Sequence, residues 1–433
     1  MLNYWAIVLL IILWPHALWG LEIDNDVTAN TTWGPGDSPV HVNKADFAVA
    51  EGATLTIEAG VTVKISSGVT VEGTLDVNGT AGSHVTFTEL NAGAGWSHLK
   101  FQRAAVTQNN TLEYADIEKL NYIYLSEQKV DFDHCSFVLA SSNIWYGLAA
   151  YGGLYKPHAD IGLTIANSTF IMNSTYDGGG SGKIAGLILD GLDTTISGSS
   201  FSLTAAGYVA EVSGLYLYES NTGAYATTVS GSTVDVAASH ADVGTVEGVY
   251  YKDATGAFQD NTVTVSGPGS IYGIRKERGS DQLSGNTVTL STTGEGGYGY
   301  LYGIYYPSTA AACNDLVVDN RVRLSTNAEY RYLYGIYTQT GMARANRVIA
   351  SHSGPSGALV GIEQRYYEGC LENNSLSLTG AGGPAVQGIA VSTHYNASSV
   401  VTIKNNIISA DGASGLVWHL SRAGQCRLRA QHL

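Results

Sequence analysis

Apolar residues recur along the chain in short clusters that are interrupted by glycine. The repeated pattern is an apolar residue, any residue, glycine and a second apolar residue. It occurs around Gly147, Gly186, Gly214, Gly248, Gly273, Gly303, Gly335, Gly361 and Gly388, and in a weaker form around Gly415. After the first interval, successive glycines lie 25 to 34 residues apart. Units this short cannot bury an apolar face alone, so the pattern predicts a solenoid of stacked repeats.

A second landmark falls between these glycines: a small, mostly polar residue, any residue, and then an apolar residue. The small positions are Cys135, Ser168, Ser199, Ser232, Asn261, Asn286, Asn320, Asn346, Asn374 and Asn406. The segments between turns are short and lack a helical period, which favours strands, two or three to each turn of a parallel β-helix. We therefore predict an internal asparagine ladder that hydrogen-bonds from coil to coil. We also predict that each repeated glycine occupies a bend where a Cβ would clash.

The chain divides into four expected segments. Residues 1–20 are expected to be a signal peptide, because a short apolar run, AIVLLIILW, precedes a plausible cleavage point after Gly20. Residues 21–47 are expected to cap the solenoid, and residues 48–416 to form it, starting with Gly-separated strands such as GATLTIEA and GVTVKISS. Residues 417–433 are basic and lack the strand-turn rhythm, which predicts an irregular tail and an uncapped or truncated end. No later stretch is apolar enough for a transmembrane helix, so we expect an exported chain without a membrane anchor.

The composition agrees with an all-β protein. Only 14% of the residues are charged, and the chain contains 52 Gly and 27 Tyr. The net charge of −15 argues against a nucleic-acid partner. The four cysteines match no metal-ligand pattern and are interpreted as structural. Cys313 and Cys370 are expected about two coils apart, roughly 10 Å, which is too far for a disulfide without distortion. We expect a monomer without a cofactor.

The N-terminal strands carry a resemblance to a known superfamily. The resemblance is carried by Thr32-Trp33, Ser38-Pro39-Val40, Gly52 to Ile57, Gly60 to Val63, Gly79-Thr80 and Val85-Thr86-Phe87. This stretch resembles the N-terminal entry of right-handed parallel β-helix proteins of the pectin-lyase-like superfamily. The resemblance implies a right-handed parallel β-helix from about residue 33 to residue 416. It implies no single activity, because the superfamily includes lyases, hydrolases, adhesins and autotransporter passengers.

The candidate binding face is aromatic. The positions directly before each repeated glycine and two after it are expected to point outward, because the positions two before and one after the glycine are apolar. The candidate ligand-binding residues at these positions are Tyr250, Tyr272, Tyr302, Tyr305, Tyr334 and Tyr337. Coils about 4.8 Å apart would align the rings in a ladder. Such a ladder suits stacking on sugar rings; the alternative is that it only stabilises the sheet.

A row of charges lies beside this ladder, with no standard catalytic motif around it. Asp190, Glu219, Asp253 and Glu277 stand four or five residues after successive glycines, next to basic residues. Asp253 and Glu277 are the candidate carboxylates of a glycosidase. A lyase would instead need a cationic side chain or bound Ca²⁺ to neutralise a uronate. The alternative is a solvated row of turn residues.

These patterns favour an exported surface protein that binds glycans or other partners through the Tyr-rich face. A polysaccharide lyase or glycoside hydrolase of the same fold is the first alternative. A non-catalytic structural solenoid, similar to an autotransporter passenger, is the second.

Overall fold

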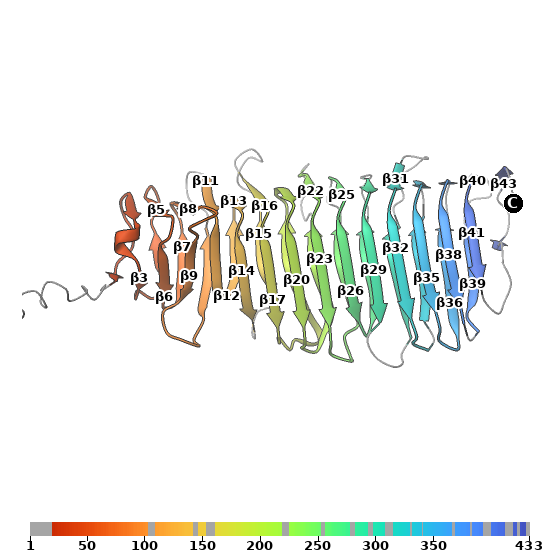
Figure 1. Ribbon diagram of the computed structural model, residues 1–433, viewed down its shortest axis with the longest axis horizontal. Helices are drawn as coiled ribbons and strands as arrows, with labels where there is room; N and C mark the ends of the chain where they lie inside the picture. Colours follow the sequence, from red (N-terminus) through yellow and green to blue (C-terminus); the bar gives the residue numbers. More distant parts are fainter. Residues whose placement is uncertain are drawn as a thin grey trace, which may run out of the picture.

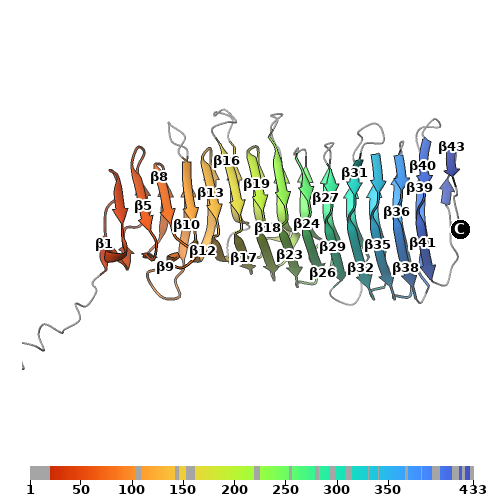
Figure 2. The same ribbon diagram turned by 45° about the horizontal axis from the view of Figure 1, so that its top comes forward.

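Alternation of apolar and polar residues produces the strands. In Arg321–Thr326 (β32), for example, Val322, Leu324 and Thr326 are buried, and the residues that alternate with them are exposed. The computed structural model describes residues 20–102, 109–141, 146–152, 161–218, 225–252, 256–277, 282–292, 298–307, 315–329, 331–339, 341–365, 369–381, 383–392, 400–411, 419–421 and 425–429. Figures 1 and 2 show these strands stacked side by side along one long axis. The predicted all-β parallel β-helix is confirmed.

Each regular coil contributes three strands, and strands of one kind stack in parallel from coil to coil. The first kind forms a 15-stranded sheet, here called the short-strand sheet. Its strands are β2 (Thr31–Trp33), β5 (Thr54–Glu58), β8 (Thr74–Asn78), β11 (Asn109–Glu113), β13 (Lys129–Asp133), β16 (Gly162–Ala166), β19 (Asp193–Ser197), β22 (Thr227–Ser230), β25 (Phe258–Gln259), β28 (Leu283–Ser284), β31 (Asp315–Val318), β34 (Gly341–Arg344), β37 (Gly369–Glu372), β40 (Val400–Lys404) and β43 (Gln425–Arg429).

The second kind follows the asparagine column and is called the asparagine series. Its strands are β1 (Leu21–Ile23), β3 (Val40–Val42), β6 (Thr62–Ile65), β9 (Val85–Glu89), β12 (Ala115–Ser126), β14 (Ser136–Ser141), β17 (Thr169–Ser174), β20 (Ser200–Ala205), β23 (Thr233–Ala238), β26 (Thr262–Gly267), β29 (Thr287–Thr292), β32, β35 (Arg347–His352), β38 (Ser375–Gly380) and β41 (Ile407–Asp411).

The third kind carries the repeated glycine and is called the glycine series. Its strands are β4 (Phe47–Val49), β7 (Gly68–Val71), β10 (Trp96–Phe101), β12, β15 (Tyr146–Tyr151), β18 (Gly179–Asp190), β21 (Val209–Tyr218), β24 (Thr245–Lys252), β27 (Ser270–Glu277), β30 (Gly299–Tyr306), β33 (Arg331–Thr338), β36 (Gly357–Arg365), β39 (Ala385–Ser392) and β42 (His419–Ser421). The long strand β12 pairs with both series and joins them into one 28-stranded sheet.

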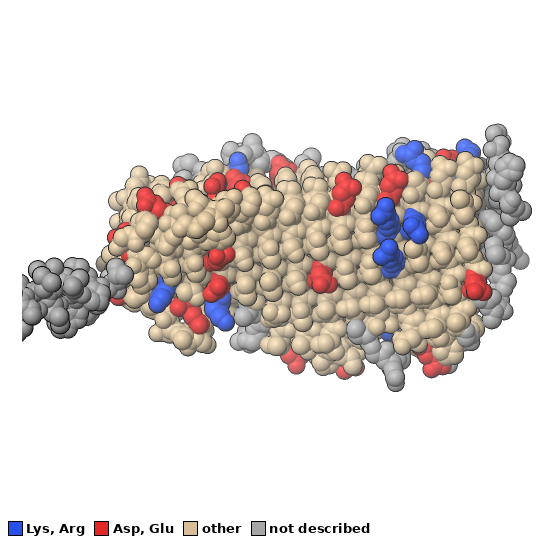
Figure 3. Space-filling model, in the orientation of Figure 1, with Lys and Arg blue, Asp and Glu red and all other residues tan. Residues whose placement is uncertain are grey.

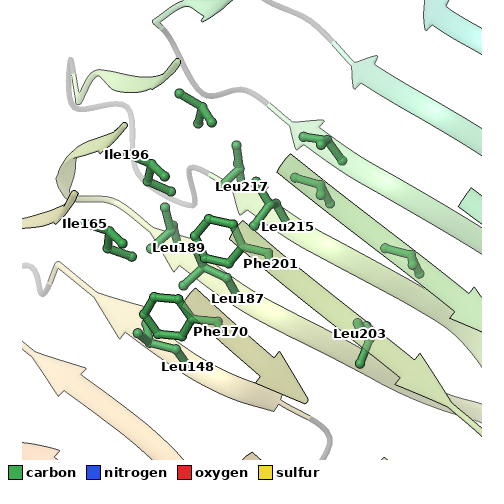
Figure 4. Packing of buried hydrophobic residues seen from close by; sticks show 14 of the residues in the cluster. Leu148, Ile165, Phe170, Leu187, Leu189, Ile196, Phe201, Leu203, Leu215 and Leu217 are labelled. Atoms are coloured by element: carbon green, nitrogen blue, oxygen red, sulfur yellow. The ribbon is translucent and has the colours of Figure 1, made fainter. Parts of the chain in front are cut away.

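The core is a continuous column of apolar side chains enclosed by the strands. One cluster of buried residues extends from Val27 to Ile403. Like residues stack above like: the ring of Phe170 lies 4.3 Å from that of Phe137 and 5.1 Å from that of Phe201, between centroids. Figure 4 shows Phe170 and Phe201 among leucine and isoleucine side chains of neighbouring coils. Burial of this shared column stabilises the coils only when they are stacked.

The predicted asparagine ladder is present and buried. The Nδ2 group of Asn286 donates to the Oδ1 atom of Asn320 at 3.0 Å, and Asn320 donates to Asn346 at 3.1 Å. Each Oδ1 atom also accepts a backbone N–H, as Asn320 does from Asn286 at 3.0 Å. The second Nδ2 hydrogen of Asn286 reaches the carbonyl oxygen of Phe258, 2.9 Å away. The side-chain amides therefore satisfy buried polar groups at the turns into the asparagine-series strands β26, β29, β32, β35, β38 and β41, while Ser168, Ser199 and Ser232 occupy the same position before earlier strands.

The repeated glycines allow two strands to approach closely. A Cβ on Gly303 would lie 2.2 Å from Cγ1 of Val322 and 2.5 Å from the carbonyl oxygen of Gly335. Gly303 and the following Ile304 are both buried, so the strand bends here and presents two successive residues to the core. The predicted steric clash is confirmed, and it arises from neighbouring atoms rather than from a left-handed backbone.

Strands are also present near both ends of the described chain. In the segment expected to be a cap, β1 pairs with β3 and β2 with β5; in the expected irregular tail, β42 pairs with β39 and β43 with β40. Cys370 is disulfide-bonded, and Cys135 is a free, buried thiol whose pKa burial raises to about 12. Residues 1–19 of the expected signal segment lie outside the described residues. Where the structure is described, no helix is long and apolar enough to cross a membrane.

Candidate binding face of the glycine series

The outward side of the glycine series carries two aligned columns of tyrosine. Strand register places Tyr272, Tyr302 and Tyr334 opposite one another on β27, β30 and β33. It also aligns Tyr305 with Tyr337, and Tyr216 with Tyr250. Figure 2 brings strands of this series, including β18, β24, β27 and β36, into view. The sequence-predicted tyrosines are therefore brought together on one face of the solenoid.

The rings stack along each column and pack edge-on between columns. Ring centroids are 5.1 Å apart for Tyr272 and Tyr302, and 4.8 Å apart for Tyr302 and Tyr334. Tyr305 and Tyr337 stack at 4.8 Å, and Tyr305 meets Tyr302 edge-on at 4.9 Å. Offset and edge-on pairs of this kind are stabilising arrangements for aromatic rings.

Close packing buries three of the six predicted ligand-binding rings, which were expected to face solvent, and leaves the other three, Tyr272, Tyr302 and Tyr305, partly exposed. Tyr250, Tyr334 and Tyr337 are only 7%, 9% and 5% exposed. The two columns lie so close on the sheet that rings of one column shield rings of the other. Burial raises the pKa of Tyr305 and of Tyr334 to about 12. Tyr250, Tyr334 and Tyr337 therefore belong to the base of the face rather than to its accessible surface.

The accessible aromatic surface belongs to tyrosines that the sequence analysis did not select. Tyr300 is 44% exposed and Tyr332 is 38% exposed. Their ring centroids lie 5.6 Å apart, and Tyr300 also contacts Tyr302 at 5.8 Å and Tyr334 at 6.5 Å. Both residues stand three positions before the repeated glycine, and tyrosine at that position in adjacent repeats is the signal that could have found them.

A cluster of polar residues on β18, β21, β24 and β27 adjoins the packed tyrosines, which we call the tyrosine base. The Lys183 ammonium lies 2.6 Å from Oε1 of Glu211 and 3.1 Å from the ring centroid of Tyr216. Burial lowers the pKa of Lys183, and the Glu211 carboxylate opposes that shift. The Ser213 hydroxyl lies 3.1 Å from a carboxylate oxygen of Glu211 and 3.1 Å from one of Glu247.

Glu247 is the buried centre of this cluster. Its side chain is fully buried, and burial together with the neighbouring Glu211 carboxylate raises its pKa to about 7. Because a hydroxyl has one hydrogen, Ser213 can form two-centre hydrogen bonds to both glutamates only when one of them is protonated. Glu247 is the group that burial favours in the neutral form. The Arg275 guanidinium, 2.8 Å from Oε1 of Glu247, stabilises the charged form.

The catalytic candidate Glu277 is held within the same network. It pairs with Arg275, and its Oε2 atom accepts a hydrogen bond of 3.0 Å from the Tyr250 hydroxyl. The other candidate, Asp253, lies outside the described residues. The register aligns Glu277 with Lys252, Tyr218 and Asp190 in the preceding coils, so Tyr218 and Lys252 separate the two described acids of the predicted row. Glu211 and Glu247, which the sequence analysis missed, share the Ser213 hydroxyl. Glu247 directly precedes a repeated glycine.

A smaller polar pair lies beyond the other end of the tyrosine base. Oε1 of Glu363 on β36 lies 2.5 Å from Nε of Arg365, and the guanidinium stands 5.5 Å from the ring centroid of Tyr337. Burial raises the pKa of Glu363, and Arg365 opposes that shift. Among the described residues, no group of three or more His, Cys, Asp or Glu side chains is placed to hold a metal ion.

No family model matches the sequence, and no curated protein matches it. A search of solved structures finds the A-module of the mannuronan C-5 epimerase AlgE6 from Azotobacter vinelandii. That match has 13% sequence identity and a TM-score of 0.25, and covers 91% of this chain and 92% of that chain. At these values it carries no argument about the activity of the present protein.

Proposed function

We propose that this protein binds a polysaccharide chain along the outward face of the glycine series. The observation that carries the proposal is the exposed pair Tyr300 and Tyr332, two adjacent rings 5.6 Å apart on a base of packed tyrosines. A ring fixed from below has little conformational entropy to lose on binding. Its flat face offers apolar contact to the C–H groups of a sugar ring, while its hydroxyl offers a hydrogen bond.

The extended shape of the face favours a polymer. The stacked tyrosines of β27, β30 and β33 repeat at about the strand spacing, 4.8 Å, along the solenoid axis. An ion pair flanks these tyrosines at each end: Glu277 with Arg275 at one end and Glu363 with Arg365 at the other. Because these charges neutralise one another, the face supports recognition by stacking and hydrogen bonding, and we propose a neutral glycan.

Export is part of the proposal. The apolar segment before Gly20 has the length of a signal-peptide core. The disulfide at Cys370 supports the same conclusion, because disulfides persist mainly in oxidising compartments outside the cytosol. Mass spectrometry of the secreted protein should find an N-terminus near residue 21. Retention of the full N-terminus in the producing cell would contradict export.

The experiment that tests the binding proposal removes the exposed rings and leaves the base. The double variant Tyr300→Ala/Tyr332→Ala should bind neutral polysaccharides at least about tenfold more weakly in affinity electrophoresis or calorimetry. The melting midpoint should change little, because both rings are substantially exposed. Tyr208→Ala is the matched control, since Tyr208 stacks on His240, 5.3 Å away, and lies outside the face.

Incubation of the wild-type protein with the same polysaccharides distinguishes a binding protein from an enzyme. Release of reducing ends or unsaturated sugars by the wild-type protein would favour a hydrolase or lyase over a binding protein. Unchanged binding by the double variant would reject the tyrosine face as the binding surface.

A further inference from the structure

A group of basic side chains lies on the asparagine series, away from the tyrosine face. Arg321 and Arg323 point outward from β32, and Arg347 points outward from β35; all three are exposed. Figure 3 shows basic atoms gathered over this part of the face, with acidic atoms beside them and a mixed set of charges nearer the N-terminal end. The concentration is unusual for this chain, which has 22 Lys and Arg residues against 37 Asp and Glu.

Strand register determines the spacing of the three arginines. Arg321 and Arg347 are directly opposite in adjacent parallel strands, so their Cα atoms are about 4.8 Å apart. Arg323 is two residues further along β32, about 7 Å from Arg321 on the same side of the sheet. All three guanidinium groups can therefore reach one bound polymer.

Folding does not account for this arrangement. None of the three arginines has an ion pair or hydrogen bond with another side chain anywhere in the described part of the chain. Like charges that are directly opposite in a sheet destabilise it. An anion bound between Arg321 and Arg347 would remove this repulsion, and no carboxylate of the described residues pairs with either arginine.

Hydroxyl groups flank the arginines on both sides. Register aligns Thr287 and Thr289 of β29 with Arg321 and Arg323, and Ser375 of β38 with Arg347. None of the outward residues of β26, β29, β32, β35 and β38 is aromatic. The face therefore offers positive charge surrounded by hydrogen-bonding groups, without rings on which nucleic-acid bases could stack.

We propose that Arg321, Arg323 and Arg347 form a second binding site, which holds a sulfated polysaccharide. A sulfate ester has three terminal oxygen atoms, so it can accept hydrogen bonds from Arg321 and Arg347 at once, whereas one arginine alone can satisfy both oxygens of a carboxylate. The flanking threonines and serine suit the hydroxyl groups of the sugar. A nucleic acid is disfavoured because the outward residues of these strands include no aromatic ring on which a base could stack.

The test uses the full secreted chain and one polymer in three forms: dextran sulfate, carboxymethyl-dextran and unmodified dextran. The wild-type protein should bind dextran sulfate, with affinity that falls as salt concentration rises. The triple variant Arg321→Gln/Arg323→Gln/Arg347→Gln should bind it at least about tenfold more weakly. Its melting midpoint should be unchanged or higher, because like-charge repulsion is removed.

The matched control removes the same number of positive charges from a part of the solenoid far from the three arginines. Lys64→Gln/Lys119→Gln/Lys129→Gln removes three cations from the N-terminal coils and should leave dextran sulfate binding within about twofold of wild type. The site is independent of the proposed tyrosine face, so Tyr300→Ala/Tyr332→Ala should also bind dextran sulfate normally. Absence of wild-type binding, equal losses in the two triple variants, or equal affinity for carboxymethyl-dextran or duplex DNA would each overturn the proposal.

Discussion

Two buried polar residues illustrate how this solenoid treats polar groups at the residue scale. Asn286 has all its hydrogen-bonding capacity matched by neighbouring coils, and its neutral side chain suits the interior. Glu247 is equally buried, but its ionisation would place three carboxylates beside two cations in the cluster. The first residue therefore stabilises the fold without regard to pH, and the second makes stability depend on pH.

Replacing Asn286 by leucine should destabilise the protein more than replacing its neighbour Thr287 by leucine. Asn286→Leu leaves the backbone N–H of Asn261 and the carbonyl of Phe258 without their partners. Each unsatisfied buried group costs about 1–3 kcal/mol. Thr287→Leu changes an outward side chain and should alter the free energy of unfolding by about 0.5 kcal/mol or less. Urea unfolding of both variants measures the difference, and equal midpoints would contradict a structural ladder.

Glu247 should make the protein less stable as the pH rises from about 5 to about 7. Its pKa in the folded protein is about 7 against an ordinary 4.5, so the folded state binds the extra proton between these values. Stability is greatest below the unfolded pKa and declines as pH rises through the folded pKa. Glu247→Gln should remove this decline, which is on the order of 1–3 kcal/mol.

The measurement is the pH dependence of the melting midpoint for wild type and Glu247→Gln. The difference between the two proteins isolates Glu247 from other groups, such as His98, whose pKa burial lowers to about 4. Glu118→Gln, at an exposed position, is the control and should keep the wild-type dependence. An identical pH profile for Glu247→Gln would show that Glu247 is ionised throughout the range.

At the scale of the element, the bend at the repeated glycine organises each glycine-series strand. On β30 it places Leu301 and Ile304 in the core, and Tyr302 and Tyr305 on the outside. The two tyrosine columns are a consequence of this bend, since strict alternation would turn one of the two outward rings inward. The same bend brings the columns close enough for edge-on contact between Tyr302 and Tyr305.

Even the smallest side chain at Gly303 should therefore disturb the strand. Gly303→Ala places a Cβ against Val322 and the backbone of Gly335, and overpacking of this kind costs about 1–3 kcal/mol. Gly303→Val should cost more. Gly82→Ala is the control, because a Cβ there meets no atom within 4 Å. Thermal unfolding compares the three variants, and a Gly303→Ala midpoint equal to that of Gly82→Ala would refute the close-approach explanation.

At the scale of the whole molecule, the solenoid separates different surface chemistries onto different sides. The glycine series presents packed and exposed tyrosines, whereas the asparagine series presents hydroxyl groups and the arginine group. Both surfaces are built by stacking one outward position through successive coils, which turns single residues 25 to 34 positions apart into continuous columns. The long apolar column inside holds the two sides in a fixed relation.

The sequence by itself determined the architecture, because each coil repeats the same local instructions. Apolar spacing around Gly303 and Asn320 predicted the stacking, the internal ladder and the tyrosine face, all of which depend on register alone. Only the tertiary structure decided which tyrosines remain accessible and how Glu247 meets Ser213 and Arg275. Accessibility depends on ring rotation and on packing between columns, and the charge cluster depends on side chains from four strands. A one-dimensional pattern places residues in columns but does not specify how their side chains cover one another.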